Sequence, residues 1–184
     1  MGMSRFKMAY FDLVDNQDNP LGKTASYDTV HRQGLWHRGV HAIIYTPDRE
    51  IVMQKRSPNL KCHPGEIEVS VGGGVDAGET PRQAIVREIR EEIGVEVDES
   101  ELRYIGKTKY NHQTKTQITR VFNYSYAVCL PKERLAMTTN REEATDAFLL
   151  TKRKLRAALR RHRIKDFGKI CGTYAYWRTL LAAV

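Results

Sequence analysis

The stretch GGGVDAGETPRQAIVREIREEIGV, residues 72–95, decides the fold, because it joins a glycine-rich loop to a clearly bounded helix. Thr80 is a favourable N-cap, Pro81 suits the first helical position, and Gln83 stands where a capping box needs it. Gly94 is typical of the residue that terminates a helix. The pattern predicts a helix that begins at about Pro81 and ends just before Gly94.

Helical spacing divides the side chains of this segment between two faces. An apolar stripe that can face a core consists of Ile85, Val86, Ile89 and Ile93. The neighbouring face carries three carboxylates, Glu88, Glu91 and Glu92. These carboxylates repel one another, and the negative end of the helix dipole adds to the repulsion.

A solvated helix face tolerates such a cluster, because each exposed like-charge pair costs only a few tenths of a kcal/mol. A cleft tolerates it only when cations are present. Hard divalent cations such as Mg²⁺ take oxygen ligands and bind substrate phosphates as well. The residues around the cluster must therefore decide between an ordinary surface and a metal site.

Those residues fit the pattern G-x(5)-E-x(7)-R-E-U-x-E-E-x-G-U, in which U is a bulky aliphatic residue. All nine fixed positions match, at Gly73, Glu79, Arg87, Glu88, Ile89, Glu91, Glu92, Gly94 and Val95. At typical residue frequencies, a chance match in this chain has a probability below about one in a million. This pattern is the Nudix box, and the chain resembles a Nudix hydrolase over most of residues 8–160.

The resemblance implies a site for Mg²⁺ or Mn²⁺ and hydrolysis of a nucleoside diphosphate linked to another moiety. It assigns the cation to the carboxylates of Glu88, Glu91 and Glu92 and to the backbone carbonyl of Gly72. Arg87 and Glu79 are expected to pair and so to hold loop and helix together, either as structural support or with a direct part in catalysis. The general base is either a box glutamate, with Glu92 assigned as catalytic, or a glutamate in a later loop. In the loop, Glu143 is the first candidate and Glu142 the second, although both can equally be ordinary loop carboxylates.

Outside the box, strands and helices mix without strict alternation, which favours an α/β sandwich over a doubly wound sheet. We expect one Nudix domain of the α/β/α type with a mixed β-sheet. Its parts are a β extension (1–36), a core (37–150) and C-terminal helices (151–184). Within the core, residues 51–56 are expected to return from the strand at 40–46 as its hairpin partner.

The segments GLWHRGVHAIIYT, QKRS and PGEIEVSVGGG look similar to Nudix proteins related to isopentenyl diphosphate isomerase. By this resemblance Arg56 and Lys61 would bind the diphosphate, or they serve only loop solubility. The isomerase activity itself is not expected. Gly72 stands where the isomerase has its catalytic Cys, and Gly74 and Arg141 replace two of its metal ligands.

The formal net charge of the chain is +8, and residues 151–170 carry all of the excess, because the positive and negative charges of the other residues balance. Leu155, Ala158, Leu159 and His162 recur there at helical spacing. We expect an amphipathic helix with either a solvated basic face or a face that attracts phosphorylated ligands or nucleic acid.

Composition and motifs limit the cellular location and the binding partners that can be expected for the chain. The 41% of hydrophobic residues argues against disorder, and no apolar run reaches the length of a membrane span. Three dispersed cysteines make no disulfide framework, so we expect a cytoplasmic protein that acts on a small diphosphate substrate. Alternatives are a Nudix domain that binds nucleic acid or a partner, hydrolysis of RNA ends, and the isomerase. A homodimer is possible on the resemblance, and nucleic acid is not favoured.

Overall fold

The computed structural model describes residues 9–60, 62–135, 137, 139 and 142–184. Its helices are α1 (Tyr27–Gln33), α2 (Pro81–Ile93), α3 (Lys152–Leu159) and α4 (Tyr174–Ala182), with short 3₁₀ turns η2 (Glu99–Glu101) and η3 (Lys132–Arg134). Its strands are β1 (Tyr10–Val14), β2 (Pro20–Ser26), β3 (Trp36–Tyr45), β4 (Glu50–Arg56), β5 (Ile67–Glu68), β6 (Val71–Gly74), β7 (Arg103–Gln113), β8 (Ile118–Cys129), β9 (Ala144–Thr151), β10 (Arg163–Ile164) and β11 (Gly168–Lys169).

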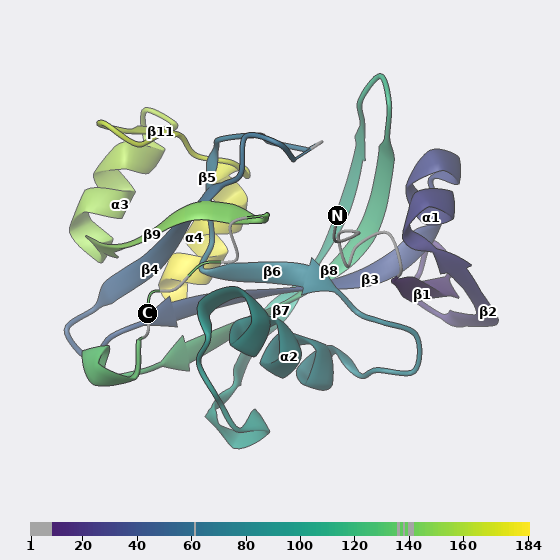
Figure 1. Cartoon of the computed structure of the whole chain (residues 1–184), viewed down its shortest axis with the longest axis horizontal. Helices are drawn as coiled ribbons and strands as arrows, with labels where there is room; N and C mark the ends of the chain where they lie inside the picture. The colour runs from purple at the N-terminus through teal and green to yellow at the C-terminus, as the bar shows by residue number, and fades with distance from the viewer. Residues whose placement is uncertain (1–8, 61, 136, 138, 140–141) are drawn as a thin grey trace.

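A mixed sheet runs through the described part of the chain in the order β5-β4-β3-β8-β7, with β6 added to β3 and β9 added to β4 (Figure 1). β3 and β8 are parallel, whereas the other pairs of this sheet are antiparallel. Alternate residues of β3 point to opposite faces, so Val40, Ala42 and Ile44 enter one apolar core and Ile43 enters the other.

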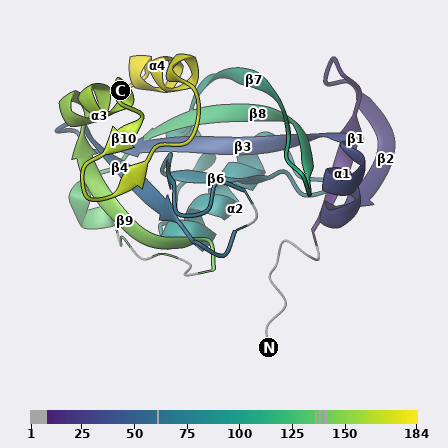
Figure 2. The ribbon, with the colours of Figure 1, turned by 90° about the horizontal axis from the view of Figure 1, so that it is seen from above.

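Helices cover both faces of this sheet, as Figure 2 shows. α2 packs on one face through Ile85, Ile89 and Ile93, which are buried. On the other face, α3 and α4 bury Leu155, Leu159 and Trp177 in the second core. The predicted α/β/α sandwich with a mixed sheet is confirmed.

The bounds of α2 agree with the local signals in the sequence. The side chain of Thr80 accepts a hydrogen bond from the backbone N–H of Gln83, and the reciprocal bond of the capping box is also present. Gly94 ends the helix at a φ of 69°, a left-handed conformation that glycine adopts without the cost of a Cβ.

The hairpin prediction for β4 is wrong over most of its length. β3 and β4 pair only at Tyr45 and Ile51. Further along, the same edge of β3 is occupied by β6, from Ala42 opposite Val71 to Gly39 opposite Gly74. Because each strand edge can pair with only one neighbour at a time, β4 turns away and pairs with β9 and β5.

The basic helix α3 is shorter than the spacing of its apolar residues predicts. α3 ends at Leu159, and His162 is exposed with a φ of 47°, so its predicted place on the apolar stripe is wrong. The chain reverses through β10 and β11 instead, which buries Ile164 and Ile170 in the second core. Burial of these two side chains favours the reversal over a longer helix of exposed cations.

His37 of β3 is buried, with 4% of its surface exposed. Its ring stacks on Phe11 with centroids 5.1 Å apart, and Nδ1 donates to the carbonyl of Leu35 at 3.1 Å, which requires the Nδ1–H tautomer. Burial lowers the pKa of His37 to about 4; the Leu35 carbonyl opposes this shift and the neighbouring His31 adds to it. His37 therefore stays neutral in the folded protein at pH 7.

Acidification is expected to destabilise the fold through His37. The unfolded chain takes up a proton near pH 6.5, whereas the folded chain resists it until about pH 4, so stability falls as the pH decreases through this window. A difference of about 2.5 pH units corresponds to about 3 kcal/mol. Urea unfolding between pH 7 and pH 4 should show a flatter dependence in His37→Gln, which keeps only the part due to His41, whose pKa burial also lowers to about 4. The same replacement at exposed His112 should keep the wild-type dependence; parallel curves for all three proteins would contradict the prediction.

No helix in the described ranges combines the length and the apolar character needed to cross a membrane. The cytoplasmic location stays a prediction.

Candidate functional site

Arg87 stands at the centre of the box residues. Its Nε and Nη2 atoms donate to the two oxygens of Glu79, each at 2.8 Å, and Nη2 also donates to the carbonyl of Gly74 at 2.9 Å. This bidentate pair joins the loop before α2 to the helix, as the sequence predicts. Nη1 contacts Glu88 at 2.5 Å and Glu91 at 3.5 Å. Burial opposes the charge of Arg87, but the surrounding carboxylates outweigh it and raise the pKa. A catalytic role for Arg87 or Glu79 stays a prediction.

Glu92 is held on the side of α2 that faces β6 and β4, and 5% of its surface is exposed. One carboxylate oxygen accepts from the backbone N–H of Gly72 at 3.2 Å, and the other accepts from Nε2 of Gln54 at 2.9 Å. Burial raises the pKa of Glu92 well above its usual range, and the carboxylates of Glu88, Glu68 and Glu143 raise it further. Glu92 thus lies next to Gly72, its predicted companion in the cation site.

Glu88 lies directly over the glycine-rich strand β6. A Cβ built on Gly73 would stand 2.2 Å from the carboxyl carbon of Glu88 and 2.3 Å from one of its oxygens. Only a residue without a side chain allows this close approach, which explains the glycine physically. The exposed fraction of Glu88 is 6%, so its carboxylate faces the interior of the site.

Glu143, the loop glutamate predicted as a base, reaches the same site from the chain segment before β9. Its backbone carbonyl accepts from Ser57 N–H at 2.8 Å, which anchors the loop to the end of β4. Glu143 lines a cavity of about 20 Å³ together with Glu88, Glu91, Asp76, Arg87, Gly74, Phe11 and Ala9. A cavity of this size holds about one water-sized species. Glu142 is not among the lining residues.

The donor set fits a hard divalent cation. Every candidate ligand offers oxygen, the carboxylates of Glu88 and Glu91 border a cavity of the right size, and Gly73 leaves room beside them. Among the described residues, however, no group of three or more His, Cys, Asp or Glu side chains is already placed to hold a metal ion. Glu88 is turned to Arg87, and Glu92 is turned to Gln54. The ligand set therefore stays a prediction, with its three carboxylates on α2 and its backbone carbonyl, that of Gly72, on β6.

The two residues predicted to bind diphosphate have different outcomes. Arg56, at the end of β4, pairs with Glu68 at 2.5 Å and donates through Nε to the carbonyl of Cys62 at 3.2 Å. Because Glu68 is one of the carboxylates that raise the pKa of Glu92, Arg56 lies at the border of the acidic cluster. Lys61 lies outside the described residues. Diphosphate binding by either residue stays a prediction.

Gln54 and Asp76 belong to the site but are not predicted from the sequence. Besides its bond to Glu92, Gln54 donates to the carbonyl of Ser70 at 2.6 Å and is 1% exposed. Its position as a polar residue in the buried strand IVMQ is a signal that could have identified it. Asp76 lines the cavity, 3.8 Å from Arg87, but loop acids carry no comparable pattern.

Comparisons with known proteins agree with this fold. A solved Deinococcus radiodurans structure aligns with a TM-score of 0.64 and 25% identity, over 91% of this chain and 96% of that chain. A MutT protein structure from Methanosarcina mazei Go1 aligns with a TM-score of 0.58 and 17% identity, over 80% of this chain and 91% of that one, which shows the fold alone.

Sequence comparison finds curated relatives that are named Nudix hydrolases. An uncharacterised one from Clostridium acetobutylicum is 28% identical over 137 residues, which are 73% of this chain and 66% of that protein. One from Deinococcus radiodurans is 37% identical over 89 residues, which are 47% of this chain and 50% of that protein. The matches thus span about two thirds and one half of these relatives. The resemblance to the isomerase branch stays a prediction.

The sequence model of the family described as NUDIX domain matches residues 35–167. This range contains the sheet strands from β3 to β9, the box helix α2 and the basic helix α3. This range includes the cavity residues from Gly74 to Glu143. On this match and on the complete box at residues 73–95, the chain belongs to the Nudix family.

Proposed function

We propose that the chain is a metal-dependent Nudix pyrophosphohydrolase that cleaves a diphosphate bond in a nucleoside diphosphate linked to another moiety. The observation that carries this proposal is the meeting of Glu143 with Glu88 and Glu91 around one cavity. Family membership and the names of the curated relatives support hydrolysis as the reaction. Nucleotides and nucleotide derivatives are the substrate class that the box implies.

Mg²⁺ or Mn²⁺ would be held by the carboxylates of Glu88, Glu91 and Glu92 and by the carbonyl of Gly72. When bound, the cation would neutralise the negative charge that develops on the phosphate oxygens. Burial of Glu92 and its bonds to Gln54 and Gly72 fix its orientation, so little reorganisation is needed. Arg87 and Glu79 hold α2 against the glycine loop and keep the carboxylates in place.

Glu143 is proposed to act as the base. Its carboxylate accepts a proton from the attacking water, the water oxygen forms a bond to one phosphorus, and the bond from that phosphorus to the bridging oxygen breaks. The two products are a phosphate ester and a second phosphate-bearing fragment.

A substrate panel tests the proposed function directly. Nucleoside di- and triphosphates, nucleotide sugars and dinucleoside polyphosphates are incubated with the protein and Mg²⁺ or Mn²⁺, and the products are followed by ³¹P NMR. We expect cleavage of a phosphoanhydride bond in at least one class and no cleavage with excess chelator. A folded protein that cleaves none of them with either ion would refute the proposal.

Glu143→Gln is expected to lower kcat by about two to three orders of magnitude with little change in KM, the usual effect of losing a general base. The loop should remain anchored, because its bond to Ser57 uses the backbone carbonyl. Glu142→Gln is the matched control and should keep nearly full activity. Unchanged turnover of Glu143→Gln at saturating metal would remove this residue from the mechanism.

A further inference from the structure

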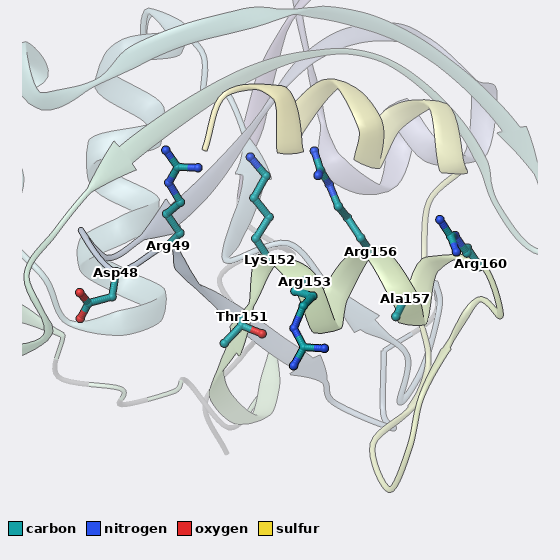
Figure 3. A pocket seen from close by; sticks show the side chains of 8 residues that line it. All are labelled: Asp48, Arg49, Thr151, Lys152, Arg153, Arg156, Ala157 and Arg160. Carbon is teal, nitrogen blue, oxygen red and sulfur yellow. The ribbon is translucent and has the colours of Figure 1, made fainter.

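A second, strongly basic pocket lies where the β3–β4 turn meets the start of α3. It has a volume of about 580 Å³ and is lined by Asp48, Arg49, Thr151, Lys152, Arg153, Arg156, Ala157 and Arg160 (Figure 3). Five of these residues are Lys or Arg and one is acidic. The pocket is separate from the carboxylate cavity, with which it shares no lining residue.

The β4–β9 ladder fixes the separation of the two sites. At one end of the ladder Arg56 pairs with Ala144, next to Glu143 of the carboxylate cavity. At the other end Glu50 pairs with Thr151, which lines the basic pocket. The seven residues of β4 span about 20 Å at the usual rise of a strand, so a ligand in the pocket does not occupy the carboxylate site.

The cations are held in place by short-range structure. Arg49 N–H donates to the carbonyl of Thr46 at 2.8 Å, and the carbonyl of Arg49 accepts from Lys152 N–H at 3.2 Å. These bonds tie the turn to α3, whose first turn is capped by Thr151 through the backbone N–H of Lys154. Arg49 has a φ of 59°, a left-handed conformation in which most residues are strained and glycine is not. An arginine in this position carries a backbone cost that a glycine would avoid.

Asp48 is the one acidic side chain among the lining residues, so the five cations leave an excess of positive charge in the pocket. None of the five cations has a salt bridge within the described ranges. Lys152 donates to the carbonyl of Val184 beyond α4, and burial together with Arg156 and Arg49 lowers its pKa. Figure 3 shows the charged ends of Arg49, Lys152 and Arg156 on the side that faces α4, whereas Arg153 points the other way.

We propose that this pocket binds the phosphate groups of a small phosphorylated ligand, either an inorganic oligophosphate or the phosphate chain of a nucleotide. Guanidinium groups bind phosphate oxygens bidentately, and Arg49 and Arg156 present two of them on the same side. The volume lies in the range of small-molecule sites, about 300–1,000 Å³. No aromatic side chain lines the pocket, so stacking of nucleic-acid bases is not provided for. This binding site goes beyond the proposed hydrolysis, and it does not depend on it.

Calorimetric titration of the full chain with tripolyphosphate tests the proposal, at about 0.15 M salt and with chelator present so that divalent cations do not contribute. Arg49→Gly and Arg156→Gln are each expected to weaken binding at least tenfold. Arg49→Gly also removes the backbone strain of the left-handed turn residue, so the melting temperature of this variant should equal or exceed that of the wild type. Loss of binding in this variant therefore cannot come from unfolding.

Two controls remove the same unit charge elsewhere. Lys154→Gln lies on α3 but outside the pocket lining, and Lys115→Ser lies in the turn between β7 and β8. Both should change the affinity less than twofold. An equal loss in controls and pocket variants, or wild-type affinity in Arg49→Gly and Arg156→Gln, would overturn the proposal.

Titrations with two further ligands, a nucleoside triphosphate and a short RNA, show which kind of phosphorylated molecule the pocket binds. Equal affinity for tripolyphosphate and a nucleoside triphosphate supports recognition of the phosphate chain alone. Tighter binding of the nucleotide, lost in the pocket variants, supports a site that also contacts the nucleoside. Binding of a short RNA without binding of either small ligand would overturn the proposal in favour of a nucleic-acid surface.

Discussion

Glu92→Gln is expected to lower kcat/KM about a thousandfold, which corresponds to about 4 kcal/mol of transition-state stabilisation. The replacement keeps the size of the side chain but removes one negative charge from the predicted cation site. Glu92 is buried, and its hydrogen bonds to Gln54 and Gly72 hold its carboxylate in one orientation. The carboxylate is therefore fixed in position and shielded from water. The loss should therefore be much larger than that from an exposed carboxylate.

Melting temperatures measured with and without metal show whether this loss of activity comes from a lost metal ligand or from a change in stability. In the wild type, saturating Mg²⁺ or Mn²⁺ should raise the melting temperature, since a ligand of the folded state at about 100 times its Kd adds about 2.7 kcal/mol. This rise should disappear in Glu92→Gln. Without metal, two effects oppose each other in the variant: Glu88, Glu68 and Glu143 no longer repel a buried charge, but the new amide can accept only one of the bonds from Gln54 and Gly72. Its melting temperature without metal should therefore stay close to that of the wild type.

The matched control is Glu96→Gln, an exposed residue just beyond the end of α2. It should keep wild-type activity and the full effect of metal on the melting temperature. A Glu92→Gln protein with turnover within tenfold of wild type, or with an unchanged metal effect, would show that Glu92 is not a ligand.

Gly73→Ala is expected to destabilise the fold by about 2 kcal/mol and to reduce activity about a hundredfold. The new Cβ would collide with the carboxylate of Glu88, which Arg87 holds in place, so either the helix or β6 must shift. Overpacking of a rigid contact typically costs about 1–3 kcal/mol. A displacement of about 1 Å in a site of this kind can cost about two orders of magnitude in rate.

Denaturant unfolding and steady-state kinetics measure the two effects. Gly106→Ala is the control, because Gly106 lies in β7 with no heavy atom within 4 Å of the added Cβ and no left-handed φ. Its unfolding free energy should stay within about 0.5 kcal/mol of wild type. A Gly73→Ala protein as stable and as active as this control would mean that Glu88 moves freely, contrary to its contacts.

The parts of the fold that could be predicted from sequence depend on residues close together in the chain. Thr80 and Gln83 define the start of α2, Gly94 defines its end, and the box pattern brings Glu79 and Arg87 together across eight residues. Such signals are local, and tertiary packing agrees with them. The fold class followed from the order of elements and from the family resemblance.

The parts that could not be predicted depend on contacts between distant segments. The bond from Gln54 to Glu92 joins residues 38 positions apart, and nothing in either segment alone indicates it. The pairing of β4 cannot be predicted from its own segment, because the edge of β3 is taken by β6, a strand that begins only at Val71. The end of α3 cannot be predicted from helical periodicity, because the burial of Ile164 outweighs it.

The parallel pairing of β3 with β8 has a consequence for how the molecule is made. Residues that are far apart in the chain, such as Trp36 and Arg120, lie opposite each other in the middle of the sheet, and the box helix is encoded between them. While a growing chain leaves the ribosome, α2 can pack against β3 and β6 as soon as it forms, but β8, which completes the sheet beside β3, emerges only later. The acidic residues thus acquire their final surroundings late in synthesis, after loop closure over a long distance has been achieved.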